Sequence, residues 1–450
     1  MVEFEKRGVP TVSFTAQNFI HDAEWSAEKF GRPGLPLAIV ELPFTNQSPE
    51  AVSASVDRSA DQVIDGLTRE SASNRPQHGI VSLPEEWLAI EGESELDALD
   101  AMNRLFLDYG WSDGFPLRPP LERFLARMLE GTTKSPDEVV AVLEPGFGKA
   151  TVEKIAANAV MAGCRPEHLP VLIAAIECLA EPQMYLRNKA MSTGPHAPLI
   201  WVNGPYAERI GLNSGICALG PGVTSYANTA IGRAVRLSMI NLGHLYPGVS
   251  DMDTIGSPTK YGMCVAENAA HSPWVPYHVE HGYDAGTSTV SVHFVYGICE
   301  LHDFTSHEAD RLVDVFATAA TNAAQVPTGH WLIGRRADPR YGTNEKEHHT
   351  MLICPEHADI FAKEGWDKDR LKEAMFARAR MPFEKIMLAK EKKAMALSHP
   401  ELSWLWQSPE TMVPVVEDPE CYDIVVVGGG AGRGAFFWGG GQPQTKAITV

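Results

Sequence analysis

The chain has 450 residues, of which 44% are hydrophobic and 21% are charged, the composition of a globular protein large enough for two or three domains. Lys and Arg number 38 and Asp and Glu number 57, giving a net charge of −19, and no basic run could follow a phosphate backbone, so nucleic acid is not an expected partner. The seven cysteines are scattered without a CxxC pair, which fits reduced thiols better than a disulfide framework or a zinc ribbon. With no basic-then-apolar leader and no apolar run of about 18 to 20 residues, a cytoplasmic protein without membrane contact is expected.

Residues 1–75 predict a partial α/β unit. A β-branched run at 8–14, helical spacing at 18–30 and an apolar run at 35–42 match the strand, helix and strand of a parallel sheet. The strand and loop that normally precede such a unit are missing, so we expect a truncated Rossmann-like unit that starts part-way through its domain.

A proline- and acid-rich linker is expected over residues 76–95, followed by a large mixed α/β domain over residues 96–450. Early in that domain, the segment GWSDGFPLRPP holds too many glycines and prolines for regular structure and predicts a shaped loop. Its Asp113 is a candidate substrate ligand, and an Asx-turn is the alternative. Two helices are predicted after the loop, over residues 121–129 and 137–143.

The stretch TVEKIAANAVMAGCRPEHLP, residues 151–170, predicts two helices joined by a turn. Apolar residues recur at helical spacing up to Gly163, which suits a helix end, and Pro166 suits the first turn of the next helix. The turn presents Cys164 and Arg165. A thiol at a helix N-terminus can have a lowered pKa, so Cys164 is a candidate catalytic thiolate and Arg165 a candidate carboxylate-binding residue. The alternative is a buried apolar cysteine at a helix junction.

Three further candidates for substrate binding follow in the chain. The apolar strand APLIWVNGP ends at Asn203, and functional side chains gather at strand ends of this kind. A glycine-rich loop at residues 211–222 contains Asn213, and the helix predicted after it, over 227–242, carries Arg233. A glycine loop, a helix N-terminus and the two arginines of this helix, Arg233 and Arg236, suit a phosphate or carboxylate. A purely structural turn is the alternative.

Histidines and carboxylates are dense between residues 259 and 303. A strand over 259–268 brings Glu267 to a polar end, and Glu267 with His278 could move protons. Because both residue types also ligate metals, a divalent transition metal is the alternative, although the segment lacks the HExxH order. The candidate metal ligands are His278, Glu280, His293 and His302.

The C-terminal third predicts further strands and helices. GHWLIG and TMLICPEH are apolar segments, helices are expected over residues 306–324 and 367–380, and a helical continuation is expected over 381–393. The segment DIVVVGGGAGRGAFF resembles a strand that enters a dinucleotide-binding loop, but Arg433 stands where the last glycine of GxGxxG is needed. It predicts a last strand with a glycine-rich turn, and no dinucleotide site is recognised.

Seven segments in order resemble a bacterial family of UGSC-type (seleno)proteins: GWSDGFPLRPP, ATVEKIAANAVMAGCRPEHLP, LIWVNGP, NTAIGRAVRL, SPWVPYHVE, CPEHADIFAKEGW and DIVVVGGGAGR. In that family a short α/β domain carries a (seleno)cysteine-Gly-Ser-Cys motif, and FEKRGVPTV looks like the tail of that domain. The motif itself is absent from this chain, so either a separate small subunit supplies it or this chain does without it. The resemblance implies a distant relation to substrate-reducing selenoproteins of the amino-acid reductase type.

These observations lead to the expectation of a subunit of a cytoplasmic enzyme, a thiol-linked reductase or lyase that acts on a small polar or anionic substrate. In this hypothesis Cys164, Glu267 and His278 are catalytic. The alternatives are a metal-dependent hydrolase or lyase and a non-catalytic scaffold subunit of a two-component complex. Because the opening strand would leave an unpaired sheet edge, we expect a homo- or hetero-oligomer.

Overall fold

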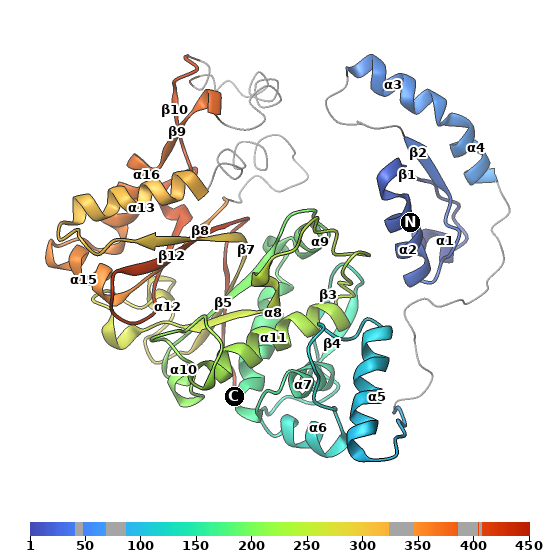
Figure 1. Ribbon diagram of the computed structural model, residues 1–450, viewed down its shortest axis with the longest axis horizontal. Helices are drawn as coiled ribbons and strands as arrows, with labels where there is room; N and C mark the ends of the chain where they lie inside the picture. The colour runs from blue at the N-terminus through green and yellow to red at the C-terminus, as the bar shows by residue number, and fades with distance from the viewer. Residues whose placement is uncertain (41–47, 69–86, 324–345, 386–403, 405–406) are drawn as a thin grey trace. The chain divides into compact units, whose positions relative to one another are not determined.

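The computed structural model describes residues 1–40, 48–68, 87–323, 346–385, 404 and 407–450. The chain divides into two compact units, one of residues 1–110 with 245–252 and one of residues 111–244 with 253–450. Both units contain helices and strands (Figure 1), so the α/β class predicted from the sequence is confirmed.

The first unit contains the predicted strand, helix and strand. Strand β1 (Ser13–Ala16) leads through α2 (Ile20–Lys29) into β2 (Leu37–Val40), and the two strands are parallel with Ser13 opposite Leu37. Parallel strands need a crossover of this kind because their ends point the same way. The other helices of this unit are α1 (Val2–Lys6), α3 (Pro49–Arg58), α4 (Ala60–Thr68) and α5 (Glu95–Asp108).

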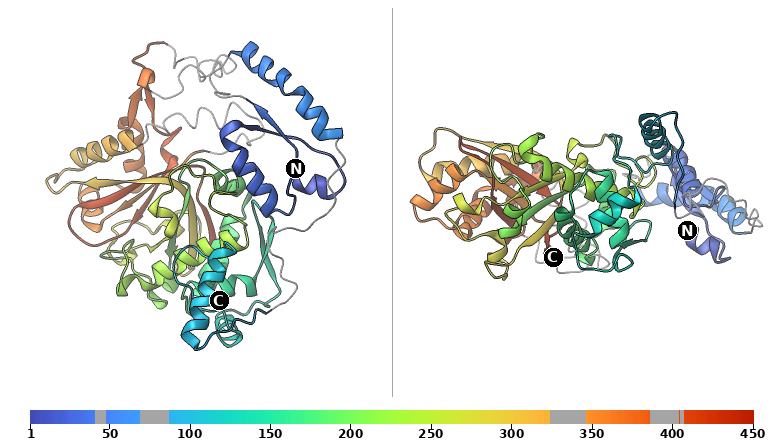
Figure 2. Two further views of the ribbon diagram at one scale, coloured as in Figure 1. Left: turned by 45° about the vertical axis from the view of Figure 1, so that its right-hand side comes forward. Right: turned by 90° about the horizontal axis from the view of Figure 1, so that it is seen from below.

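The second unit is built around a mixed seven-stranded sheet in the order β11-β8-β12-β7-β5-β6, with β13 also paired to β7. Neighbouring strands come from distant parts of the chain, and the green, yellow and red strands that lie side by side in Figure 2 show this. The strands are β5 (Ala197–Asn203), β6 (Met263–Ala266), β7 (Thr289–His302), β8 (His349–Ile353), β11 (Tyr422–Val426), β12 (Arg433–Gly439) and β13 (Gln444–Ala447).

The sheet curls back on itself. Strands β6 and β11 stand at opposite ends of the strand order, yet the Asn268 N–H just after β6 donates to the Val426 carbonyl of β11 at 2.7 Å. The concave face encloses an apolar core in which Trp201 meets Tyr277 edge to face, with ring centroids 5.1 Å apart. The core of this face also includes Leu199, Val265, Val295, Leu352, Val425 and Phe437.

Helices also pack against strands of the sheet. A second core cluster joins β8, β11 and β12 to helices α13 (Ala309–Ala323), α15 (Pro355–Lys363) and α16 (Lys368–Arg378). Towards the other end, α8 (Leu169–Leu179) packs on β7 and β13, and α11 (Tyr226–Asn241) packs on β6. Shorter helices of this unit are α6 (Glu122–Leu129), α9 (Leu186–Ala190), α10 (Pro205–Arg209) and α12 (Tyr277–Glu280).

The turn between α7 (Val152–Met161) and α8 forms as the sequence predicts. Helix α7 begins where the Thr151 hydroxyl accepts the Lys154 N–H at 3.3 Å. Its C-cap, Ala162, is followed by Gly163, whose φ of 85° is in the left-handed region that favours glycine. A short 3-10 turn, Pro166–His168, then leads into α8. In the described part of the chain no single helix is long and apolar enough to span a membrane, and only the bent pair Pro166–Leu179 with Pro182–Ala190 meets that test jointly.

Two helix predictions are wrong. The segment predicted as a helix over 137–143 is strand β3 (Val139–Leu143), antiparallel to β4 (Gly148–Thr151). The three valines of β3 favour a strand. The turn between β3 and β4 places β4 beside β3 as its pairing partner. The expected continuation over 381–393 begins instead with β9 (Arg380–Pro382), paired to β10 (Met412–Pro414). The remainder of that continuation beyond residue 385, and the segment GHWLIG, lie outside the described residues.

Candidate functional site

The structure brings Asn203 and Glu267 together at the ends of two parallel strands. Asn203 is the last residue of β5, and Glu267 follows the last residue of its neighbour β6. The Asn203 side-chain amide donates to Glu267 Oε2, and the Tyr277 N–H donates to the same oxygen at 2.9 Å. One oxygen of the carboxyl group is therefore fixed from two sides.

The second oxygen of Glu267 faces a different environment. Oε1 is buried and has no hydrogen-bond partner among the residues that the structure describes, and Lys368 Nζ lies 3.9 Å away. Burial raises the pKa of Glu267, while Lys368, the Tyr277 N–H and Asn203 offset part of that rise, so the pKa is about 7 instead of 4.5. A carboxyl group with this pKa can both take up and release a proton near neutral pH.

Lys368, the first residue of α16, links Glu267 to Glu280. Its ammonium group donates to Glu280 Oε2 and to the Val275 carbonyl at 3.0 Å, and Lys372 lies 3.6 Å from the other Glu280 oxygen. Glu280, predicted as a metal ligand, is thus neutralised by two lysines of α16.

His278 is buried on α12 beside Tyr277. Burial lowers the pKa of His278, and the nearby Lys368 lowers it further. Neither ring nitrogen makes a hydrogen bond to a described residue. The imidazole is therefore neutral at neutral pH, and the structure shows no hydrogen bond between it and Glu267.

The concave face of the sheet holds a second ionisable group, Asp423. The Tyr277 hydroxyl donates to one oxygen of Asp423 at 2.9 Å, and His348 Nδ1 lies 2.8 Å from the other. Burial alone would raise the pKa of Asp423, but His348 outweighs it and the pKa is about 2. Asp423 is therefore a buried anion, and Tyr277 connects it to Glu267 through its hydroxyl and its backbone N–H.

Sequence reasoning missed Tyr277, His348 and Asp423 as members of this network. One signal was available for Asp423, because an aspartate within the apolar strand YDIVV predicts a buried carboxylate that needs partners. The partners themselves, which lie 75 and 146 positions away in the sequence, give no comparable signal.

The four predicted metal ligands do not form one site, which corrects the metal hypothesis. His293 and His302 lie nine positions apart on β7, roughly 30 Å along an extended strand. His293 is buried, with Nδ1 2.8 Å from the Thr350 hydroxyl and Nε2 3.2 Å from the Gly441 carbonyl, whereas His302 is exposed. Among the described residues, no group of three or more His, Cys, Asp or Glu side chains is arranged to hold a metal ion.

Cys164 is not the activated thiolate that the sequence predicts. Its side chain is buried, and burial raises the pKa of the thiol well above its usual value, an effect that the distant Arg233 only partly offsets. The expected lowering of the Cys164 pKa is therefore wrong, because the side chain is buried and burial disfavours the charged thiolate. The neighbouring Arg165 is exposed, with its guanidinium 5.1 Å from the ring centroid of Tyr226.

Asp113 and Arg233, both predicted to bind substrate, bind each other. The guanidinium donates to both carboxylate oxygens, at 2.6 and 2.9 Å, and also to the carbonyls of Phe115 and Pro116. Asp113 also accepts the Phe115 N–H at 3.2 Å, the Asx-turn considered as the alternative. This pair ties the loop of residues 110–120 to α11.

Asn213 shapes the glycine-rich loop that contains it. Its side-chain oxygen accepts the Gly215 N–H at 2.9 Å, and its amide donates to the Ile216 carbonyl and the Ser225 hydroxyl, each at 2.9 Å. All three contacts stay within residues 213–225, so Asn213 fixes the start of α11.

The C-terminal glycine-rich turn does not cradle a phosphate in this structure. The N–H groups of Ala431 and Gly432 both donate to Glu356 Oε2, at 2.7 and 2.6 Å, and the chain continues into β12 rather than into a helix. A carboxylate of the protein itself thus occupies the backbone donors.

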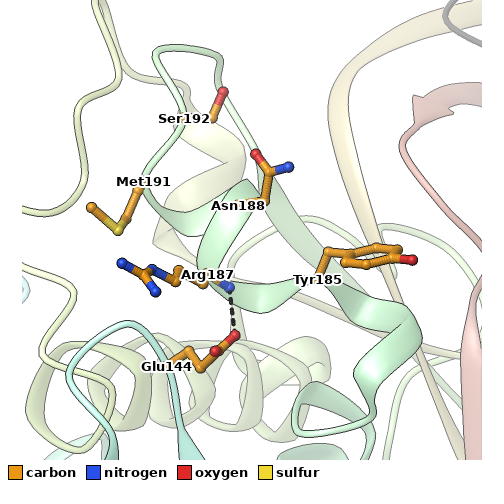
Figure 3. A pocket seen from close by; sticks show the side chains of 6 residues that line it. All are labelled: Glu144, Tyr185, Arg187, Asn188, Met191 and Ser192. Carbon is orange, nitrogen blue, oxygen red and sulfur yellow. Dashed lines mark hydrogen bonds between the residues drawn. The ribbon is translucent and has the colours of Figure 1, made fainter. Parts of the chain in front are cut away.

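A surface cavity of about 450 Å³ lies beside α9 (Figure 3). Glu144 Oε2 accepts the Arg187 N–H at 3.2 Å, so the carboxylate caps the first turn of that helix. Of the described residues, one cation and one anion line this cavity, and they offer no excess charge for a ligand. Its lining residues are Glu144, Tyr185, Arg187, Asn188, Met191 and Ser192.

Together, the fold and this network define an α/β protein with a paired set of buried acid–base groups. The UGSC family model matches residues 1–69, the segment that contains FEKRGVPTV, and this confirms the resemblance predicted from the sequence over that segment. The seven segments from residue 110 onwards lie outside the match. No curated protein and no solved structure matches the chain.

Proposed function

We propose that the chain is a subunit of an enzyme that moves a proton on a small polar or anionic substrate, in a lyase-type reaction with Glu267 as the acid–base group. The observation that carries this proposal is the buried carboxyl group of Glu267, which has a pKa of about 7. One of its oxygens is fixed by Asn203 and Tyr277, and the other has no hydrogen bond to any described residue. Perturbed ionisable groups of this kind cluster at catalytic sites.

The proposed reaction uses the two protonation states of Glu267, the carboxylate and the carboxylic acid. The Glu267 carboxylate takes a proton from a substrate carbon, the electron pair of the broken C–H bond forms a double bond, and the leaving group departs with its own bonding pair. Glu267 then returns the proton to the leaving group. Lys368, 3.9 Å from Glu267, supplies a positive charge beside the reacting oxygen.

The acid–base chemistry is preferred to thiol chemistry because of Cys164. A thiol whose pKa is raised by burial remains protonated at neutral pH and is a poor nucleophile. The lyase half of the sequence-based hypothesis is therefore retained, and the thiol-linked half has no support from the surroundings of Cys164.

The test is turnover of a panel of small hydroxy- and aminocarboxylates in D2O, followed by proton NMR. We expect the wild-type protein to consume or deuterate at least one compound, and Glu267→Gln to reduce that rate by about a hundredfold or more, because an amide cannot carry the proton. Glu300→Gln is the matched control, since Glu300 is an exposed residue paired with Arg433.

Three results would contradict the proposal. One is a wild-type protein that leaves the whole panel unchanged. Another is a Glu267→Gln variant as active as the wild type. The third is loss of turnover in Cys164→Ser but not in Glu267→Gln, which would return the reaction to the thiol.

A further inference from the structure

A second cavity, of about 440 Å³, lies at the turn between α7 and α8. Its wall combines a cationic rim with an apolar floor, in which Met128, Val160 and Cys164 are each buried. Concave sites of roughly 300 to 1,000 Å³ are the usual size for metabolite binding. The cavity is lined by Arg118, Phe124, Arg127, Met128, Val160, Cys164, Arg165, Pro166, Glu167 and Tyr226.

The charge of this cavity is opposite to that of the chain. Among the described residues, three arginines and one glutamate line it, an excess of two positive charges in a protein whose net charge is −19. Within the described residues, Arg118 and Arg127 make no ion pair with a carboxylate. Arg165 and Glu167 lie 4.0 Å apart with side chains 64% and 43% exposed, so solvent screens this pair. The positive charge is therefore available to a ligand.

Aromatic rings hold two of these arginines in place. The Arg118 guanidinium lies 4.1 Å from the ring centroid of Phe124, and the Arg165 guanidinium lies 5.1 Å from that of Tyr226. A guanidinium stacked on a ring keeps its N–H edges free, and those edges match the geometry of carboxylate and phosphate groups. The Tyr226 hydroxyl donates to the Gly163 carbonyl, which fixes this ring as a wall.

We propose that this cavity binds an organic anion of metabolite size. Its carboxylate or phosphate group contacts Arg118, Arg127 and Arg165, and its apolar part lies against Phe124, Met128 and Val160. Cys164 contributes a neutral thiol to the apolar floor and forms no bond to the ligand. The inference does not depend on the acid–base role of Glu267, because it concerns binding and not turnover.

The test is calorimetric titration of the purified full chain with named probes. Phenyl phosphate and phenylacetate each carry an anion and an apolar ring, inorganic phosphate carries the anion alone, and phenylacetamide is a neutral analogue of phenylacetate. We expect phenyl phosphate or phenylacetate to bind at least tenfold more tightly than both inorganic phosphate and phenylacetamide. The tighter of the two identifies the anionic group.

Two single variants connect the binding to the cavity. Arg127→Ala should weaken the better probe about tenfold or more, because it removes a charged donor. Arg123→Ala is the matched control, since Arg123 lies on the same helix and 4.9 Å from the same Phe124 ring but does not line the cavity. An unchanged midpoint of urea unfolding shows that both variants are folded.

Three outcomes would overturn the inference. The first is a wild-type protein that shows no binding of either aromatic anion at ligand concentrations up to the millimolar range. The second is equal binding of phenylacetate and phenylacetamide, which would show that the charge does not matter. The third is equal weakening by Arg123→Ala and Arg127→Ala, which would show a general surface-charge effect.

Discussion

Glu267 and Asp423 are two buried carboxyl groups whose pKa values shift in opposite directions. Burial raises the pKa of Glu267 to about 7, and Lys368 at 3.9 Å offsets only part of that rise. One oxygen of Glu267 has no hydrogen-bond partner among the described residues. Asp423 is also buried, but His348 at 2.8 Å outweighs the effect of burial, so the pKa of Asp423 falls to about 2. At neutral pH, Asp423 remains an anion while Glu267 exchanges its proton.

The raised pKa of Glu267 makes stability depend on pH. Because the folded-state value of about 7 is above the unfolded value of 4.5, the folded chain binds the proton more tightly. The stabilisation is therefore complete below pH 4.5 and is lost as the pH rises through 7. Glu267→Gln removes this dependence. We expect the unfolding free energy of the wild type, relative to the variant, to fall by about 3 kcal/mol over that window.

Urea unfolding at several pH values measures this difference, and Asp423 does not affect the comparison because both proteins contain it. Glu300→Gln makes the same chemical change at an exposed position and should parallel the wild type at every pH. A constant difference between the wild type and Glu267→Gln would show that the carboxyl group titrates normally.

At the scale of elements, the pair Asp113–Arg233 connects an irregular loop to helix α11. The Arg233 side chain is 16% exposed and that of Asp113 is 5% exposed, so solvent hardly screens the pair. The same guanidinium also binds two backbone carbonyls of the loop. Both residues therefore have a structural role in holding the loop. The sequence pattern alone predicts substrate binding for them.

Arg233→Ala should free the loop of residues 110–120. Breaking a buried pair leaves an uncompensated carboxylate, and we expect a loss of about 3 kcal/mol in unfolding free energy with faster hydrogen exchange in the loop. Arg233→Lys should recover only part of the unfolding free energy and of the hydrogen-exchange protection, because lysine cannot make a bidentate contact with the carboxylate. Arg209→Ala, at an exposed arginine beside Tyr206, serves as the control. Unchanged exchange in the loop of Arg233→Ala would refute this role.

At the scale of the whole molecule, the described residues of the first unit leave one edge of its two-stranded sheet unpaired. A sheet of two strands is only marginally stable by itself, and in the described part of the chain β1 pairs with β2 alone. On β2, the Ile39 N–H donates to Gln62 Oε1 at 2.9 Å, and the Ser59 hydroxyl donates to the Ile39 carbonyl at 3.1 Å. The β1 side therefore remains the candidate edge for pairing, beside a Phe14 that is 53% exposed.

We accordingly expect the purified chain to assemble with itself, with a mass in light scattering that is a multiple of 49.2 kDa. Phe14→Lys should shift the mass towards that of the single chain, since a charge on an exposed strand opposes pairing. Leu96→Lys changes another exposed apolar residue, 73% exposed on α5, and should leave the mass unchanged. A stable single chain in the wild type would contradict the prediction.

The sequence by itself determined the α/β class, the parallel strand–helix–strand unit and the helix junction at Gly163. These features depend on local rules, because periodicity, capping hydroxyls and glycine conformations act over a few residues. It also placed Asn203 and Glu267 at strand ends. Where a segment depended on a distant partner, as at residues 137–143, the local pattern predicted a helix and the chain forms a strand paired to β4.

Only the tertiary structure decided which polar side chains meet. The contacts of Tyr277 with Asp423, of Asn203 with Glu267 and of Arg233 with Asp113 join residues 146, 64 and 120 positions apart. Burial separated the candidates further, leaving Cys164 as a neutral thiol and Glu267 with a pKa near neutral pH. The physical reason is that strand order and the curl of the sheet set both proximity and solvent access, and neither quantity is encoded in the spacing of residues along the chain.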